Sequence, residues 1–232
     1  MHRTPYRLSA VAVAVAAAAL SASAHADTVQ FLGYAHGFVD INYQLIGSQA
    51  TSGSTGAGGF VTKLNGLDPT FTTYCVDLYQ YIGFNQPAFD GYVNIPASAH
   101  TFRNANAGVD LARLFSSGHV VNDALTEAAF QIAVWEITYE TTGNYNVAAG
   151  DALFTGAGAD TVTALGLAEN WLEHLGTGNG VNVRVLESGT YQDEVFATPV
   201  PEPGTVSLSF AALGLMAGVM RRRRDRAMSF GR

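Results

Sequence analysis

The sequence predicts an α+β protein in which a β-sheet body, either a sandwich or barrel-like, carries an attached helical portion. Short strand-like runs occupy residues 28–95, and helical runs follow in residues 109–175. Strands and helices are therefore separated along the chain instead of alternating as βαβ units, which is typical of α+β folds. We also expect an N-terminal signal helix and a C-terminal membrane helix outside this domain.

The N-terminus has the three parts of a secretion signal. Residues 1–7 are basic, residues 8–20 form an apolar run rich in Ala and Val, and Ala24 and Ala26 supply the small side chains that signal peptidase accepts. We expect cleavage before Asp27, so that residues 1–26 are a signal peptide. An uncleaved membrane helix is the alternative, but the apolar stretch is short for a crossing.

The first half of the domain predicts strands. Alternating apolar residues indicate a hairpin or two separate strands within residues 28–45. Residues 47–59 are almost entirely Gly, Ser, Thr and Ala, so we expect an exposed flexible loop there. Strand-like runs resume at residues 60–64, 71–82 and 91–95.

Helices are expected next. A short helix covers residues 109–115, and a longer one runs from Ala124 to about Glu140, capped by Asn122 or Asp123. One face of the longer helix is apolar and is expected to face the core. It consists of Leu125, Ala128, Ala129, Ile132, Trp135 and Tyr139.

A further helix at residues 160–175 and a strand at 181–186 complete an ectodomain of residues 27–190. Residues 191–199 are expected to be a linker. Between Asp27 and Val200 the chain has 17 acidic residues and four basic ones, a net charge near −13 with His neutral. Because nucleic-acid binding depends on Lys and Arg that neutralise phosphates, this charge argues against nucleic acid as a partner.

Residues 200–232 have a distinct order of parts. Pro201, Glu202 and Pro203 come first, an apolar stretch at residues 205–220 follows, and Arg221, Arg222, Arg223 and Arg224 end the pattern. The prolines keep the chain extended, which makes it accessible to a processing enzyme. The 16 apolar residues would span about 24 Å as a membrane helix, less than the ~30 Å hydrocarbon core. The arginines would stay on the cytoplasmic side.

This tail resembles the PEP-CTERM sorting signal of Gram-negative bacteria. The resemblance implies that exosortase, a membrane-embedded cysteine protease, processes the tail, and that the inner membrane holds the chain transiently. It also implies a final location at the cell surface or in the extracellular matrix, where such proteins are associated with polysaccharide and biofilm. A plain single-pass anchor is the alternative, but it leaves the Pro-Glu-Pro unexplained.

Cys75 is the single cysteine of the chain. In an oxidising envelope it cannot close an internal disulfide, so it is buried and inert, pairs with another chain, or has another chemistry. A dyad of a cysteine hydrolase with His36, His100 or His119 is disfavoured, because no small-residue elbow or helix start surrounds Cys75. The scattered histidines give no metal-ligand spacing, so no metal site is expected.

Two segments bear on Cys75. Tyr74-Cys75-Val76 resembles the cysteine motif of bacterial thioester domains, and the segment from Ala128 to Glu136 resembles their glutamine motif. Those domains are best known from Gram-positive surface adhesins. The resemblance implies that the Cys75 thiol and the Gln131 amide condense into an internal thioester, which then captures amine or hydroxyl targets.

Thioester chemistry explains these residue types. An acyl group on sulfur stays electrophilic where an amide would be inert, and water must be kept away from it. Tyr74, Phe130 and Trp135 are candidates for shielding the bond. Glu136 is a candidate supporting residue that falls within the apolar face, so we expect it to be hydrogen-bonded or paired, for example with Arg113.

On the same helical wheel, Gln131 lies roughly 90° from the centre of the apolar face, where an ordinary surface glutamine would also lie.

Taken together, the export signals and the thioester resemblance predict a non-enzymatic function that needs no cofactor: an exported adhesin with a reactive bond. A structural matrix protein without one is the alternative.

Overall fold

The computed structural model describes residues 26–84 and 86–200. Six strands form a closed antiparallel barrel in the order β1-β4-β5-β9-β8-β6. The strands of the barrel are β1 (Asp27–Tyr34), β4 (Phe60–Leu64), β5 (Leu67–Cys75), β6 (Phe89–Pro96), β8 (Val181–Glu187) and β9 (Glu194–Pro199). The expected β-sheet body is thus barrel-like, with helices attached.

A second sheet has the order β3-β2-β7. It is built from β2 (Val39–Leu45), β3 (Thr51–Ala57) and β7 (Ala152–Thr155). Every second residue of β2 is buried, as expected for a strand with one face on the core. Residues 28–45 therefore form two strands in different sheets and not a hairpin.

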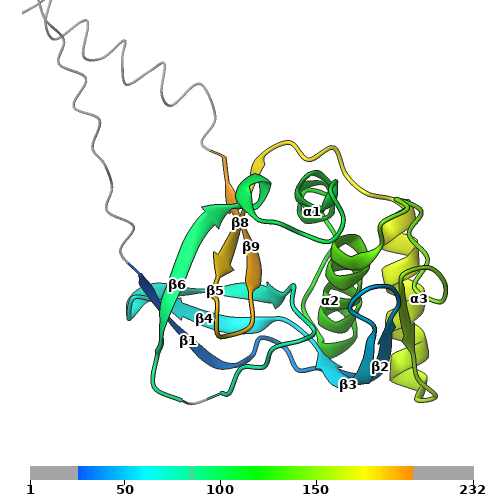
Figure 1. The fold of residues 1–232 in the computed structure, drawn as a ribbon, viewed down its shortest axis with the longest axis horizontal. Helices are drawn as coiled ribbons and strands as arrows, with labels where there is room; N and C mark the ends of the chain where they lie inside the picture. Colours follow the sequence, from blue (N-terminus) through cyan, green and yellow to red (C-terminus); the bar gives the residue numbers. More distant parts are fainter. Residues whose placement is uncertain (1–25, 85, 201–232) are drawn as a thin grey trace, which may run out of the picture.

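The helical portion contains α1 (Ala107–Phe115), α2 (Ala124–Tyr139) and α3 (Ala159–Glu173), with a short 3₁₀ helix, η1 (Ala97–Ala99), after β6. In Figure 1, α2 stands between the barrel and α3. It contacts α1, α3, β5 and all three strands of the second sheet. Neighbours on every side bury all residues from Glu127 to Tyr139.

A local signal fixes the start of α2. The Asp123 side chain accepts a hydrogen bond from the Thr126 amide at 2.8 Å, and the Thr126 hydroxyl accepts one from the Asp123 amide at 3.1 Å. This reciprocal capping box satisfies donors that a helix leaves free in its first turn. The prediction of Asp123 as one of two possible caps is confirmed.

The loop expected at residues 47–59 was wrong, because β3 occupies most of it. Small residues are required in β3 because aromatic side chains of neighbouring residues lie close to its backbone. A Cβ on Gly53 would lie 2.9 Å from the Tyr43 hydroxyl, and one on Gly56 would lie 2.8 Å from the Phe38 ring. Composition alone suggested flexibility, whereas the strand is held by pairing with β2.

The linker expected at residues 191–199 was also wrong. Residues 194–199 form β9, which pairs with β5 on one side and β8 on the other and so closes the barrel. The expected ectodomain boundary at residue 190 therefore moves to the end of β9. The short strand β7 was not expected from the sequence at all.

The two export signals lie almost wholly outside the described residues. This applies to the signal peptide up to residue 25, with Ala24, and to residues 201–232, with Pro201, the expected membrane helix 205–220 and the arginines. Within the part of the chain that the structure describes, no helix has the length and apolar character needed to cross a membrane.

Candidate functional site

The site begins at Cys75, the last residue of β5. Its neighbour across the sheet is Glu194 of β9, and the Val76 amide donates to the Asp193 carbonyl at 3.0 Å. The strand ends at this point, and the chain that follows contacts α2 through a hydrogen bond from the Leu78 amide to the Tyr139 hydroxyl. Only 1% of Cys75 is exposed, so the thiol is enclosed on all sides.

Gln131 meets Cys75 from α2. The Gln131 Oε1 accepts a hydrogen bond from the Cys75 amide at 2.9 Å, and its Nε2 donates to the Cys75 carbonyl at 2.8 Å. The two residues are 56 positions apart in the chain. The side-chain amide is therefore clamped in one orientation, with its carbonyl carbon beside Cys75.

The helical wheel misplaced Gln131. It suggested a position like that of a surface glutamine, but the side chain is fully buried. The wheel assumes one core-facing side, whereas α2 has protein on every side. A buried primary amide is costly unless its polar atoms are paired, and both of its heavy atoms are paired with Cys75.

The Cys75 sulfur is held by the residue two positions ahead. It donates to the Asp77 carbonyl at 2.9 Å and accepts from the Asp77 amide at 3.3 Å. Burial is the main cause that raises the pKa of the thiol well above its usual range, and the charge of Glu194 raises it further. A neutral sulfur species is therefore favoured here over a thiolate.

The three expected shielding residues lie in two places. The Trp135 indole is near enough to the Cys75 thiol to lower its pKa. Its N–H has no hydrogen-bond partner of good geometry within the described residues. Tyr74 and Phe130 pack together with ring centroids 4.5 Å apart. The Tyr74 hydroxyl donates to the buried Glu127 at 2.9 Å, and His36 contacts the same carboxylate at 2.6 Å.

Glu136 is not paired with Arg113, which instead contacts Asp110 at 2.9 Å. The Glu136 Oε1 accepts from the Asn146 amide at 2.7 Å, while Oε2 has no partner among the described residues. Burial raises the pKa of this carboxyl to about 8. Desolvation thus favours the protonated acid. Of the two alternatives expected for Glu136, a hydrogen bond is present and an ion pair with Arg113 is not.

Glu194 is a site residue that sequence reasoning missed. It is fully buried opposite Cys75, and neither carboxylate oxygen has a hydrogen-bond partner of good geometry within the described residues. Burial raises its pKa well above the ordinary value, and the nearby Thr73 hydroxyl offsets only part of this. The short apolar run from Val195 to Ala197 that follows it was a weak strand signal, but the segment was expected to be a linker.

A pocket of about 310 Å³ lies beside this site. Its wall includes Val76 and Asp77, which directly follow Cys75, and Tyr139, whose hydroxyl accepts from the Leu78 amide at 2.9 Å. Ionisable side chains of Asp77, His100, Arg103, Glu187 and Asp193 also line it.

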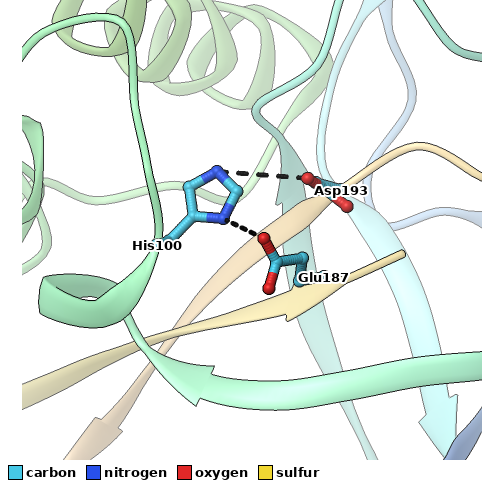
Figure 2. A group of neighbouring side chains, drawn as sticks. All are labelled: His100, Glu187 and Asp193. Carbon is cyan, nitrogen blue, oxygen red and sulfur yellow. Dashed lines mark ion pairs between the residues drawn. The ribbon is translucent and has the colours of Figure 1, made fainter. Parts of the chain in front are cut away.

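None of the three histidines considered for a dyad makes a hydrogen bond to Cys75 in the described structure. His36 contacts Glu127, His119 stacks on Trp171 with ring centroids 4.5 Å apart, and His100 lies between two carboxylates (Figure 2). The hydrolase dyad therefore gains no support from the geometry.

Comparison with protein families identifies the tail. The PEP-CTERM protein-sorting motif matches residues 199–224. This match indicates an exported protein that passes through a membrane-associated intermediate and is processed by exosortase. Searches of curated proteins and of solved structures found no match to this chain.

Proposed function

We propose that the exported domain captures targets covalently through an internal thioester between Cys75 and Gln131. The observation that carries this proposal is the pair of hydrogen bonds, at 2.9 and 2.8 Å, that fixes the Gln131 amide against the main chain of Cys75. Juxtaposition of a thiol-bearing residue and a primary amide in a buried site is the requirement of the reaction.

The forming step balances without a cofactor. The Cys75 sulfur attacks the Gln131 carbonyl carbon, the carbon–nitrogen bond breaks, and the thiol proton leaves with Nε2 as ammonia. The Cys75 N–H already points at Oε1. Such a preoriented donor stabilises the negative charge that develops on this oxygen in the tetrahedral intermediate.

Burial is compatible with the thioester product in this site. A thioester carries no charge, so the desolvation that opposes a Cys75 thiolate does not oppose the bond. The enclosure that leaves Cys75 1% exposed also limits hydrolysis by water. Trp135 supports this shielding directly, whereas Tyr74 and Phe130 would act by packing around the adjoining part of α2.

In the capture step, the target is the nucleophile and the Cys75 sulfur is the leaving group. A target amine or hydroxyl attacks the same carbonyl carbon, the carbon–sulfur bond breaks, and the proton of the nucleophile passes to sulfur. An amine leaves an amide bond to Gln131, and a hydroxyl leaves an ester. Export by the PEP-CTERM route would present this reaction to molecules at the cell surface or in the surrounding matrix.

Intact mass of the full chain after signal removal, purified in detergent and unfolded just before measurement, tests the proposal. We expect a mass lower than calculated by one ammonia, uptake of one methylamine, and no reaction with thiol reagents before that uptake. Cys75→Ala is the matched control and should show its full calculated mass. The full calculated mass together with a freely titrating Cys75 would reject the thioester and favour a non-covalent matrix protein.

A further inference from the structure

We infer that His100, Glu187 and Asp193 form a binding site for a first-row divalent cation, with Zn²⁺ preferred. The three residues come from separate parts of the barrel end: His100 follows η1, Glu187 ends β8 and Asp193 precedes β9. Figure 2 shows the imidazole ring between the two carboxylates. They line the pocket beside the Cys75 turn.

The spacing of the donor atoms is close to that of a metal site. One ligand atom from each residue lies within 4.8 Å of the others. The His100 Nδ1 is 3.3 Å from the Glu187 Oε1, and Nε2 is 4.0 Å from the Asp193 Oδ2. Tetrahedral zinc with bonds of about 2.0–2.1 Å separates its ligands by about 3.3–3.4 Å. The separation of His100 Nδ1 from Glu187 Oε1 already matches this value. Because an imidazole gives one nitrogen to a metal ion, Asp193, which now lies nearer Nε2, would have to turn toward Nδ1 to complete the set.

The burial of His100 is a second, independent observation. Its side chain is only 10% exposed, yet Nδ1 has no hydrogen-bond partner of good geometry within the described residues. The 3.3 Å contact with Glu187 is therefore close but misdirected for a hydrogen bond. Buried polar nitrogens are almost always paired.

The excess of acidic side chains around the site would also favour binding of a cation. Asp77, Glu187 and Asp193 share the pocket with the single guanidinium of Arg103. The three carboxyl groups outnumber this one cation and repel one another. A bound divalent ion would relieve this repulsion. The Ser188 amide donates to the Asp193 Oδ1 at 2.6 Å, which orients the carboxylate as outer-shell contacts do in metal sites.

The donor set selects the kind of metal. One imidazole nitrogen with two carboxylates suits zinc and related transition ions, whereas Ca²⁺ and Mg²⁺ prefer oxygen ligands throughout. Three protein ligands leave a fourth position for water or a ligand group. The adjoining cavity of about 310 Å³ has room for either.

Isothermal titration of the untagged full chain, in detergent and after removal of metal with a chelator, tests the site with Zn²⁺, Ca²⁺ and Mg²⁺. We expect one Zn²⁺ per chain and much weaker binding of the other two ions. Loss of an outer-shell contact costs about 10–100-fold in metal affinity, so loss of a ligand should weaken Zn²⁺ at least about tenfold. His100→Gln and Glu187→Gln are the two variants.

His174→Gln is the matched control, because His174 is exposed and makes its hydrogen bond to the Asn170 carbonyl. It should bind Zn²⁺ as the wild type does. Equal binding by the wild type and by a folded Glu187→Gln variant, or no stoichiometric binding at all, would overturn the inference. Cys75→Ala should also bind Zn²⁺ normally, so this result is independent of the thioester.

Discussion

Replacing Glu136 by Gln should stabilise the domain, and the gain should grow as the pH rises. Glu136 is fully buried, and its pKa rises from 4.5 to about 8 in the folded chain. Between these values the folded chain keeps a proton that the unfolded chain has released. The stability of the wild type therefore falls as the pH rises through this window, and the variant lacks that loss.

The magnitude follows from the shift. Each pH unit between the two pKa values costs about 1.4 kcal/mol, so the penalty is under about 1 kcal/mol at pH 5 and about 3 kcal/mol at pH 7. The side-chain carbonyl of the introduced glutamine would still accept from the Asn146 amide, and its NH₂ group replaces an oxygen that has no partner within the described residues. Any cost of that NH₂ group is the same at each pH.

Urea unfolding at pH 5, 6 and 7, followed by the fluorescence of the two buried tryptophans, measures the effect. The difference between Glu136→Gln and the wild type should widen by about 2–3 kcal/mol from pH 5 to pH 7. Glu173→Gln, at an exposed position of α3, controls for the loss of one negative charge. Parallel stability curves for the wild type and Glu136→Gln across this range would refute the reasoning.

Two further substitutions test a buried hydrogen bond to α2 and the N-terminal cap of this helix. Tyr74→Phe removes the hydroxyl that donates to Glu127 at 2.9 Å; because Glu127 is buried, urea unfolding should show a loss of about 1–3 kcal/mol, and an unchanged midpoint would contradict this. Asp123→Ala removes the side-chain cap of α2 and should lower the midpoint of thermal unfolding by about 2–4 °C. Asp123→Asn keeps an acceptor and should melt close to the wild type; equal losses in both variants would argue against capping.

Local signals in the sequence were sufficient for elements that depend on near neighbours. Asp123 marked the start of α2, and the alternating valines marked β8. In contrast, β3 pairs with the neighbouring β2, but its Gly, Ser and Thr residues resemble a loop. For β9, one of the two pairing partners is the distant β5, and the segment was taken for a linker. The all-round burial of α2 likewise removed the one-sided pattern that a helical wheel requires.

The residues of the candidate site also fall into those that the sequence predicted and those that it did not. Cys75 and Gln131 were identified through motif resemblance, and the structure places them side by side. Glu194 was missed because its strand was not expected. The cluster of His100, Glu187 and Asp193 has no spacing signal, since closure of the barrel is what brings residues 100, 187 and 193 together.

The last barrel strand, β9, ends at Pro199, where the sorting motif begins. Glu202 follows three residues later, a distance of at most about 11 Å in an extended chain. A protease that reads this motif therefore works almost against the barrel wall. Any mechanical load on an uncut tail also passes straight into β9, whose hydrogen bonds to β5 and β8 close the barrel. Cutting the tail would remove that load from one of the six strands that close the barrel.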